Sequence, residues 1–185
     1  INPTSVLVWR YAIASLLFLA WMIAKRESFH LRLGPAIRMA VLGTFMAMSS
    51  ATLYLSFKYM DAGIASTILF SYPIITAVLM TAFFHERITW STTFSILLAV
   101  TGIGLLYRGG DNATLSTVGV ALVLLSSLFY AFYIIGVNQT HTGLSAIQFT
   151  FWVVLFGLIS LLVLSVIMGE QIQVLTTPKQ WACAA

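Results

Sequence analysis

A proline interrupts the apolar stretch "SYPIITAVLMTAFF" (71–84), and hydroxyl-bearing side chains surround it. In a helix, Pro73 removes one backbone N–H and displaces the carbonyl of Leu69 from the hydrogen-bond ladder. If this helix lies in lipid, the displaced carbonyl needs another partner or a polar cavity. The hydroxyl-bearing residues near the proline are Ser66, Thr67, Ser71, Tyr72 and Thr76. The cluster favours a substrate path at a helix kink; helix packing through small hydroxyl residues is the alternative.

A few charged and aromatic side chains are further candidates for a functional site. Arg10 lies inside the first apolar run, where a charge costs about 2.5–3.5 kcal/mol and marks function by default; snorkelling to the headgroups is the equal alternative. Glu86 and Arg87 end the run that contains the proline. We interpret them as an interfacial ion pair, with proton coupling through Glu86 as the sharper alternative. Tyr54 and Tyr130 either line a pathway or pack.

The sequence offers no set of residues for catalysis or metal binding. Cys183 is the only cysteine, which excludes an internal disulfide and a cysteine-based metal site. His85-Glu86 begins like a zinc-protease helix, but position 89 is Thr89, so the second histidine ligand is missing. No Ser/His/Asp set falls within the apolar runs, and neither an enzyme nor a bound cofactor is expected.

The composition places most of the molecular surface in lipid. Only 8% of the 185 residues are charged and 60% are hydrophobic, whereas a soluble domain carries about 25% charged residues. A membrane-spanning helix needs about 20 apolar residues. The stretches that approach this length are 4–24, 36–57, 62–84, 89–107, 117–137 and 146–168. Such long runs disfavour a β-barrel, and we predict an all-α, polytopic transmembrane helix bundle.

The distribution of basic residues predicts the orientation of these helices. The bases of the link 25–38 are Lys25, Arg26, Arg32 and Arg38. Short loops rich in Lys and Arg face the cytoplasm, so 25–38 and 85–90 are expected there, and 108–116 and 169–180 outside. The N-terminus would lie outside, in a multi-pass protein of the plasma membrane, the inner membrane of a bacterium. The bases do not gather on one face, so the net charge of +4 does not indicate nucleic-acid binding.

Two distant segments resemble each other faintly. "TSVLVWRYAIASLLFLAWMI" (4–23) is similar to "LSAIQFTFWVVLFGLISLLVLSVI" (144–167), and each precedes a polar link and a proline. The copies are an odd number of helices apart, so they cross the membrane in opposite directions. This indicates an inverted-topology repeat, which many secondary transporters contain; chance similarity between apolar helices is the alternative.

The chain also resembles the EamA-type domain of the drug/metabolite transporter superfamily. The most specific part is 61–104, with its Ala/Ser-rich helix start, Pro73, the Glu86-Arg87 pair and Gly102. "WRYAIASLLFL" (9–19) is similar to the family's Arg-aromatic-x-x-Ala helix, and "VGVALVLLSSLFYAFYIIGV" (118–137) to the first helix of its second domain.

The resemblance implies ten helices in two inverted five-helix repeats, with both termini in the cytoplasm and a central cavity for small metabolites. On that plan, residues 1–111 form the first repeat without its first helix, and residues 112–185 begin a truncated second repeat. The chain would be a fragment holding the second to seventh helices. Ser95 stands where the family usually has a glycine. Thr150 of the second copy stands where the first copy has Arg10, so only the first repeat would contribute this charge to the cavity.

These observations predict a secondary transporter that works by alternating access. The resemblance implies export, or sometimes uptake, of small metabolites or drug-like compounds. The alternative is a non-transporting membrane scaffold or subunit. The expected partners are the lipid bilayer, a small-molecule substrate and, as an open alternative, a second copy of the chain in a homodimer; nucleic acid is not expected. The face that carries Ser126, Ser127 and Tyr130 is expected to pair with helices outside this chain.

Overall fold

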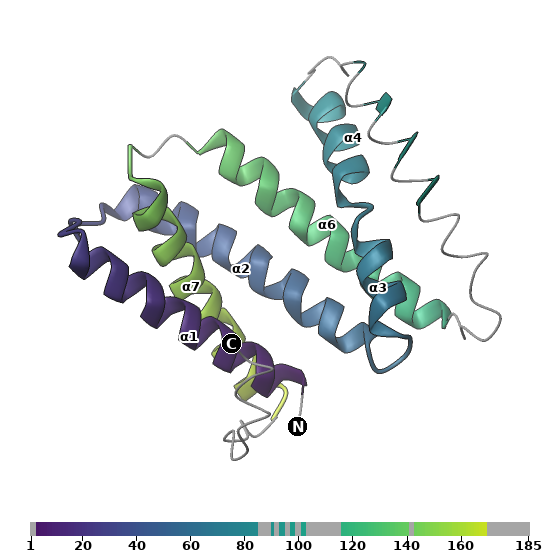
Figure 1. Cartoon of the computed structure of the whole chain (residues 1–185), viewed down its shortest axis with the longest axis horizontal. Helices are drawn as coiled ribbons and strands as arrows, with labels where there is room; N and C mark the ends of the chain where they lie inside the picture. Colours follow the sequence, from purple (N-terminus) through teal and green to yellow (C-terminus); the bar gives the residue numbers. More distant parts are fainter. Residues whose placement is uncertain are drawn as a thin grey trace. The chain divides into compact units, whose positions relative to one another are not determined.

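The computed structural model describes residues 3–84, 90, 93–94, 97–98, 101–102, 116–140 and 143–169. All regular structure in these ranges is α-helical (Figure 1). The helices are α1 (Pro3–Ala24), α2 (Leu33–Ser56), α3 (Ala62–Leu69), α4 (Tyr72–Phe84), α6 (Thr117–Gln139) and α7 (Ala146–Ile167). The prediction of an all-helical fold is confirmed for this part of the chain.

Five stretches in the described ranges are long and apolar enough to cross a membrane, with α3 and α4 together forming one of them. This confirms the predicted polytopic helix bundle. The spans agree with the predicted runs except that α2 begins at Leu33, because Pro35 is accommodated in its first turn, where a missing N–H costs nothing. Most of the predicted run 89–107 lies outside the described residues.

The chain divides into two compact units, which are described one at a time. Unit 1 comprises Ile1–Ala51 and Val137–Ala185, and unit 2 comprises Thr52–Gly136. Unit 1 therefore contains α1, most of α2 and α7. Unit 2 contains α3, α4 and most of α6. Each unit joins helices from both predicted repeats, whose boundary at residues 111 and 112 stays a prediction.

In unit 1, α7 packs against both α1 and α2. Glycine makes the crossing with α2 possible, because a Cβ atom at Gly43 would lie 2.5 Å from the carbonyl oxygen of Val153 and 2.8 Å from the amide nitrogen of Gly157. The side of Gly157 that faces α1 is filled by the ring of Tyr11, whose hydroxyl lies 3.0 Å from Ser50 Oγ. Small residues at such crossings let backbones approach closely, which is how membrane helices gain packing energy.

The contacts of unit 1 also define the directions of its helices. Gln148 at the start of α7 bonds to Glu27, which follows the end of α1, and Gly157 lies further along α7 against Tyr11 in the first half of α1. The two helices are therefore antiparallel. The similar segments 4–23 and 144–167 therefore run in opposite directions; that they are copies of an inverted repeat stays a prediction.

The link between α1 and α2 has a defined backbone. Glu27 N–H donates to the Met22 carbonyl and Arg26 N–H to the Ile23 carbonyl, which is the Schellman pattern of helix ends. Arg26 occupies the left-handed position of that motif, with φ 52°. Glycine is the usual residue there, and a side chain with a Cβ costs about 1–2 kcal/mol in this conformation.

In unit 2, α3 and α4 run parallel to α6. Met60, just before α3, packs beside Gly119 of α6, and Met60, Ala65 and Val123 form a buried cluster. Further along both helices Tyr72 meets Tyr130. Asp61 caps the start of α3, since its Oδ1 accepts a hydrogen bond of 2.8 Å from the Gly63 N–H. The parallel packing places the α3–α4 junction beside the middle of α6.

Candidate functional site at the break between α3 and α4

The proline-containing span is not a continuous helix but two helices. α3 ends at Leu69 with Phe70 as its C-cap, and α4 begins at Tyr72, with Pro73 in its first turn. Phe70 and Ser71 donate their N–H groups three residues back, to Thr67 and Ile68. This tightening of the last turn is usual at helix ends. The predicted kink is therefore a full break.

The Leu69 carbonyl, which Pro73 displaces from the ladder, finds its partner on α6. The Ser127 hydroxyl lies 3.2 Å from the Leu69 oxygen and 3.0 Å from the carbonyl of Val123 on its own helix. A hydroxyl has one hydrogen to donate. It therefore donates this hydrogen to one carbonyl at a time, or to both in a bifurcated hydrogen bond. Ser127 is fully buried. The carbonyl thus gains a partner where an unsatisfied group would cost several kcal/mol in lipid.

A second hydroxyl completes a short chain of hydrogen bonds. Ser71 Oγ donates to Ser127 Oγ over 3.4 Å. The expectation that Ser127 and Tyr130 pair only with helices outside this chain is wrong, because both contact the break between α3 and α4. The parallel packing of unit 2, which local sequence does not encode, brings these residues together. Ser127 was not singled out as a site residue; a serine pair within an apolar run was the only signal.

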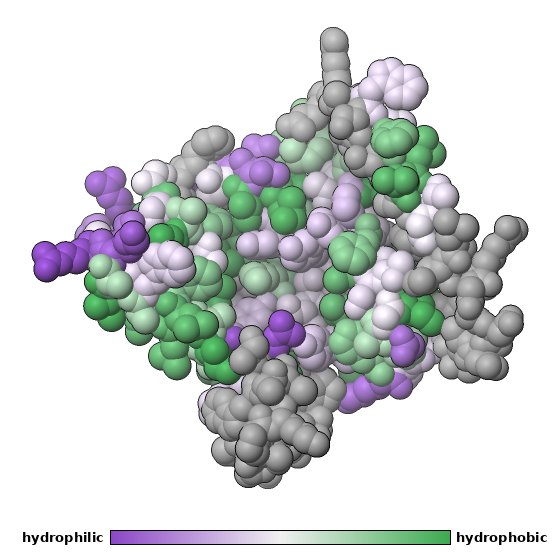
Figure 2. All heavy atoms as spheres, in the orientation of Figure 1, coloured by the Kyte–Doolittle hydropathy of each residue, from purple (hydrophilic) through white to green (hydrophobic). Residues whose placement is uncertain are grey.

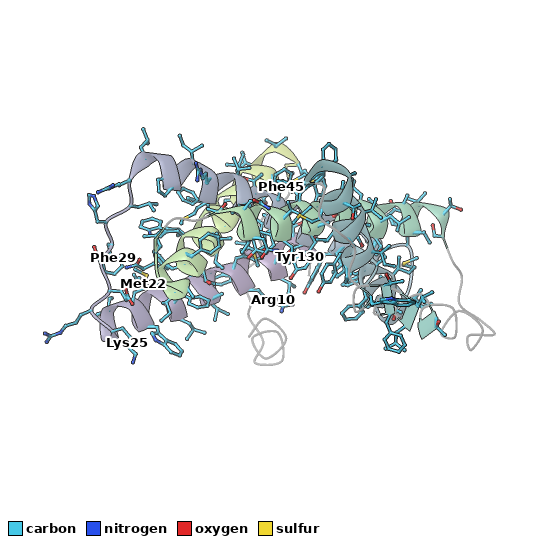
Figure 3. All side chains as sticks on the ribbon, turned by 90° about the horizontal axis from the view of Figure 1, so that it is seen from above. Arg10, Met22, Lys25, Phe29, Phe45 and Tyr130 are labelled. Carbon is cyan, nitrogen blue, oxygen red and sulfur yellow. The ribbon has the colours of Figure 1, made fainter. Side chains whose placement is uncertain are left out.

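Aromatic rings extend the site by one turn. Tyr72 packs edge-to-face on Tyr130, with ring centroids 4.7 Å apart and planes at 80°. Tyr133 follows on α6 at 5.7 Å from Tyr130; Tyr130 is labelled in Figure 3. Edge-to-face pairs contribute about 0.5–1.5 kcal/mol beyond the area that they bury. These contacts hold the start of α4 against α6.

Thr76 carries a buried hydroxyl that makes no hydrogen bond among the described residues. Several other hydroxyls of the described helices donate to the carbonyl four residues earlier, as Thr81 does to Ala77. Thr76 lies one turn after Tyr72, so it shares the face of α4 that meets α6. An orphaned buried hydroxyl costs about 1–3 kcal/mol. One buried hydroxyl that could still bond to a ligand, that of Thr76, therefore lies one turn beyond the break.

The remaining candidates are described one by one. Ser66 and Thr67 donate to carbonyls of their own helix, and Tyr54 packs on Phe57. Arg10 is exposed on α1, in unit 1. Glu86 and Arg87 lie outside the described residues, so their roles stay predictions.

The chemistry of the site is neutral. In the described spans of unit 2, Ala62–Phe84 and Thr117–Gly136, no side chain is charged. No group of three or more metal-ligating side chains is found within the described ranges. The polar groups that the site offers are therefore hydroxyls and one backbone carbonyl, beside aromatic faces and without any charge.

Comparison with known proteins gives a consistent assignment. The family model of the EamA-like transporter family matches residues 1–108. An uncharacterised transporter of Archaeoglobus fulgidus is 26% identical over 133 residues, which are 72% of this chain and 46% of the relative. An uncharacterised transporter of Synechocystis is 30% identical over 115 residues, 60% of this chain and 34% of the relative. The chain thus matches less than half the length of either curated relative.

Proposed function

The chain belongs to the EamA-like transporter family. From this we propose that it forms part of a multi-pass membrane protein that acts as a secondary transporter. We propose that the whole protein exports small metabolites or drug-like compounds by alternating access. Family membership and the transporter names of the relatives argue against an enzyme.

The observation that carries this proposal is the broken helix of unit 2. In transporters, discontinuous membrane helices place unpaired backbone groups at substrate and ion sites. Irregular backbone at membrane depth is tolerated only where it is buried in protein or lines a polar cavity. Here the break between α3 and α4 exposes the Leu69 carbonyl to a hydroxyl of another helix at 3.2 Å. A proline break with a carbonyl paired to another helix is therefore the feature of this chain that most resembles such a site.

The break also offers a two-state element for alternating access. The Ser127 hydroxyl has two acceptors, the carbonyls of Val123 and Leu69. A shift of α4 against α6 would move this hydrogen from one carbonyl to the other, so the hydroxyl itself stays bonded in both states. When it turns to Val123, the Leu69 carbonyl is free to accept a hydrogen bond from water or substrate. Transport needs such an element, whose two arrangements differ little in free energy. Uptake of labelled metabolites into proteoliposomes with the full-length protein tests the proposal. A protein that inserts and moves none of them would favour the scaffold function.

Thr76→Val should raise stability and lower transport. Valine has nearly the shape of threonine, so the change removes an unpaired hydroxyl and relieves its desolvation cost. If the hydroxyl pairs with substrate, flux should fall about two- to tenfold, the worth of one hydrogen bond. The unfolding temperature in detergent and initial flux at equal protein density measure the two effects.

Thr81→Val is the matched control. Thr81 is on the same helix, is exposed, and donates to Ala77. Its replacement should leave flux within error of the parent. A loss of flux as large as that of Thr76→Val would mean that any threonine of α4 matters and would remove Thr76 from the site.

The topology has its own test. We expect residues 25–38 on the cytoplasmic side and residues 108–116 outside, from the distribution of bases. Single cysteines at Ser28 and Asn112, introduced after Cys183→Ser, should react with an impermeant thiol reagent from opposite sides. Labelling of both from one side would contradict the orientation and the inverted repeat with it.

A further inference from the structure

The link between α1 and α2 gathers basic side chains at one end of unit 1. The exposed bases there are Lys25, Arg26, His30 and Arg32 in the link, and Arg38 in the second turn of α2. Figure 2 shows hydrophilic residues at this end of the unit, and Figure 3 places Lys25 and Phe29 there. The positive-inside tendency accounts for the number of these bases. It does not account for how their backbone is held.

The acidic residue of the link is turned toward the protein. Glu27 Oε2 accepts a hydrogen bond of 2.8 Å from Gln148 Nε2. Gln148 is only 8% exposed, and its Oε1 is occupied by the Ser145 N–H in the capping box of α7. The carboxylate is therefore fixed on a buried amide. The outer surface of the link is left with positive side chains.

Further contacts keep the link in one conformation. The same Gln148 amide donates to the Ser28 carbonyl over 3.1 Å, and the Phe29 ring packs edge-to-face on Phe151 at 6.4 Å. The link is thus attached to α7 through three successive residues, Glu27, Ser28 and Phe29. A pre-organised site loses less entropy on binding than a flexible one.

Arg26 occupies a backbone position that favours glycine. The other described residues with left-handed backbone are Gly143 and Gly169. The Schellman bonds need only backbone atoms, so glycine would serve the helix end better than arginine. Strain of this kind at a non-glycine residue indicates a use for its side chain.

Apolar side chains set the depth of the link in the membrane. Trp21, Phe29, Leu33 and Ile37 are exposed and alternate with the bases along the chain. Aromatic residues at helix ends lie at the headgroup level. The bases that neighbour them in the chain should therefore lie near the lipid phosphates.

We propose that this link is a binding site for the phosphate headgroup of an anionic phospholipid, with the Arg26 guanidinium as its central contact and Lys25 and Arg32 beside it. Guanidinium groups bind phosphate oxygens in a two-pronged geometry. Basic clusters next to a membrane helix are attracted to anionic lipid. The inference does not depend on transport, so it can fail or hold independently of the proposed function.

Arg26→Gly tests the proposal because it should change stability and lipid binding in opposite directions. In nanodiscs of phosphatidylcholine, the variant should unfold at the same or a higher temperature, since the backbone strain is removed. Its affinity for phosphatidylglycerol, measured by titrating that lipid and following the unfolding temperature, should fall about fivefold, the effect of one cation near the headgroups.

Two further variants show whether the position matters. Lys58→Gln removes an exposed base of unit 2 and should leave phosphatidylglycerol affinity unchanged. Arg26→Gly combined with Ser28→Arg keeps the charge of the link and should not restore affinity. The proposal is overturned if Arg26→Gly binds phosphatidylglycerol like the parent, if Lys58→Gln loses as much, if the double variant is fully restored, or if free inorganic phosphate gives the same stabilisation as the lipid.

Discussion

Gly43→Ala is expected to destabilise unit 1 strongly although alanine is the better helix former. The added methyl group would lie 2.5 Å from the Val153 carbonyl oxygen and 2.8 Å from the Gly157 amide nitrogen. Both are backbone atoms of α7, so no side-chain rotation relieves the clash and the helices must separate. Overpacking of this kind costs about 1–3 kcal/mol, sometimes more. The unfolding temperature in detergent should fall by several degrees, at about 2–4 °C per kcal/mol for this chain length.

The other glycines of these helices provide graded controls. A Cβ at Gly157 would approach the Tyr11 ring at 2.8 Å, and a ring can move further than a backbone, so Gly157→Ala should be milder. A Cβ at Gly34, also on α2, meets nothing within 4 Å. Gly34→Ala should therefore be neutral or stabilising. Equal losses at Gly34 and Gly43 would mean that helix crossing does not explain the glycine.

Pro73→Ala should leave insertion intact and abolish most transport. Alanine restores the N–H that a continuous helix would donate to the Leu69 carbonyl. The Ser127 hydroxyl then loses one of its two acceptors. Proline disfavours a continuous helix by about 3 kcal/mol, so its removal can shift the balance toward the unbroken span by roughly a hundredfold. We expect flux to fall at least about tenfold at equal expression, measured in proteoliposomes.

Serine variants of α6 separate the break from general damage to this helix. Ser127→Ala removes the donor to Leu69 and should also lower flux. Ser126→Ala, a change at an equally buried neighbour, should lower it less. If both serine variants transport like the parent, the hydrogen bond to Leu69 has no part in the cycle.

Substitutions at Glu86 and Arg10 test whether these charged side chains take part in transport. Glu86→Gln should leave flux and its pH dependence nearly unchanged, since an ion pair at the headgroup level contributes about 0–1 kcal/mol. Arg10→Ala should weaken transport, because an intramembrane charge is usually functional. The reverse pattern, with pH-dependent flux lost in Glu86→Gln and retained in Pro73→Ala and Arg10→Ala, would make Glu86 the proton carrier and the break a packing feature.

Several features of this protein follow from local sequence alone. Long apolar runs predicted the membrane spans, because the free energy of placing a helix in lipid is close to a sum over its own residues. Pro73 predicted the displaced Leu69 carbonyl for a similar reason, since the missing N–H and the steric clash are properties of one residue and its own turn. The resemblance to the EamA family also rests mainly on the segment that contains Pro73, residues 61–104.

The partners of these groups were decided by the tertiary structure. The donor to Leu69 lies 58 residues away in the chain, and nothing local distinguishes Ser127 from Ser126. Likewise, the sequence alone does not distinguish Arg26 from the other bases that orient the helices. It also does not predict that Glu27 accepts a hydrogen bond from Gln148. Hydrophobicity and covalent geometry act within one helix and can be evaluated there. Hydrogen-bond partners and close glycine contacts depend on which helices pack and in which register, and that register is set by side chains of segments distant in sequence.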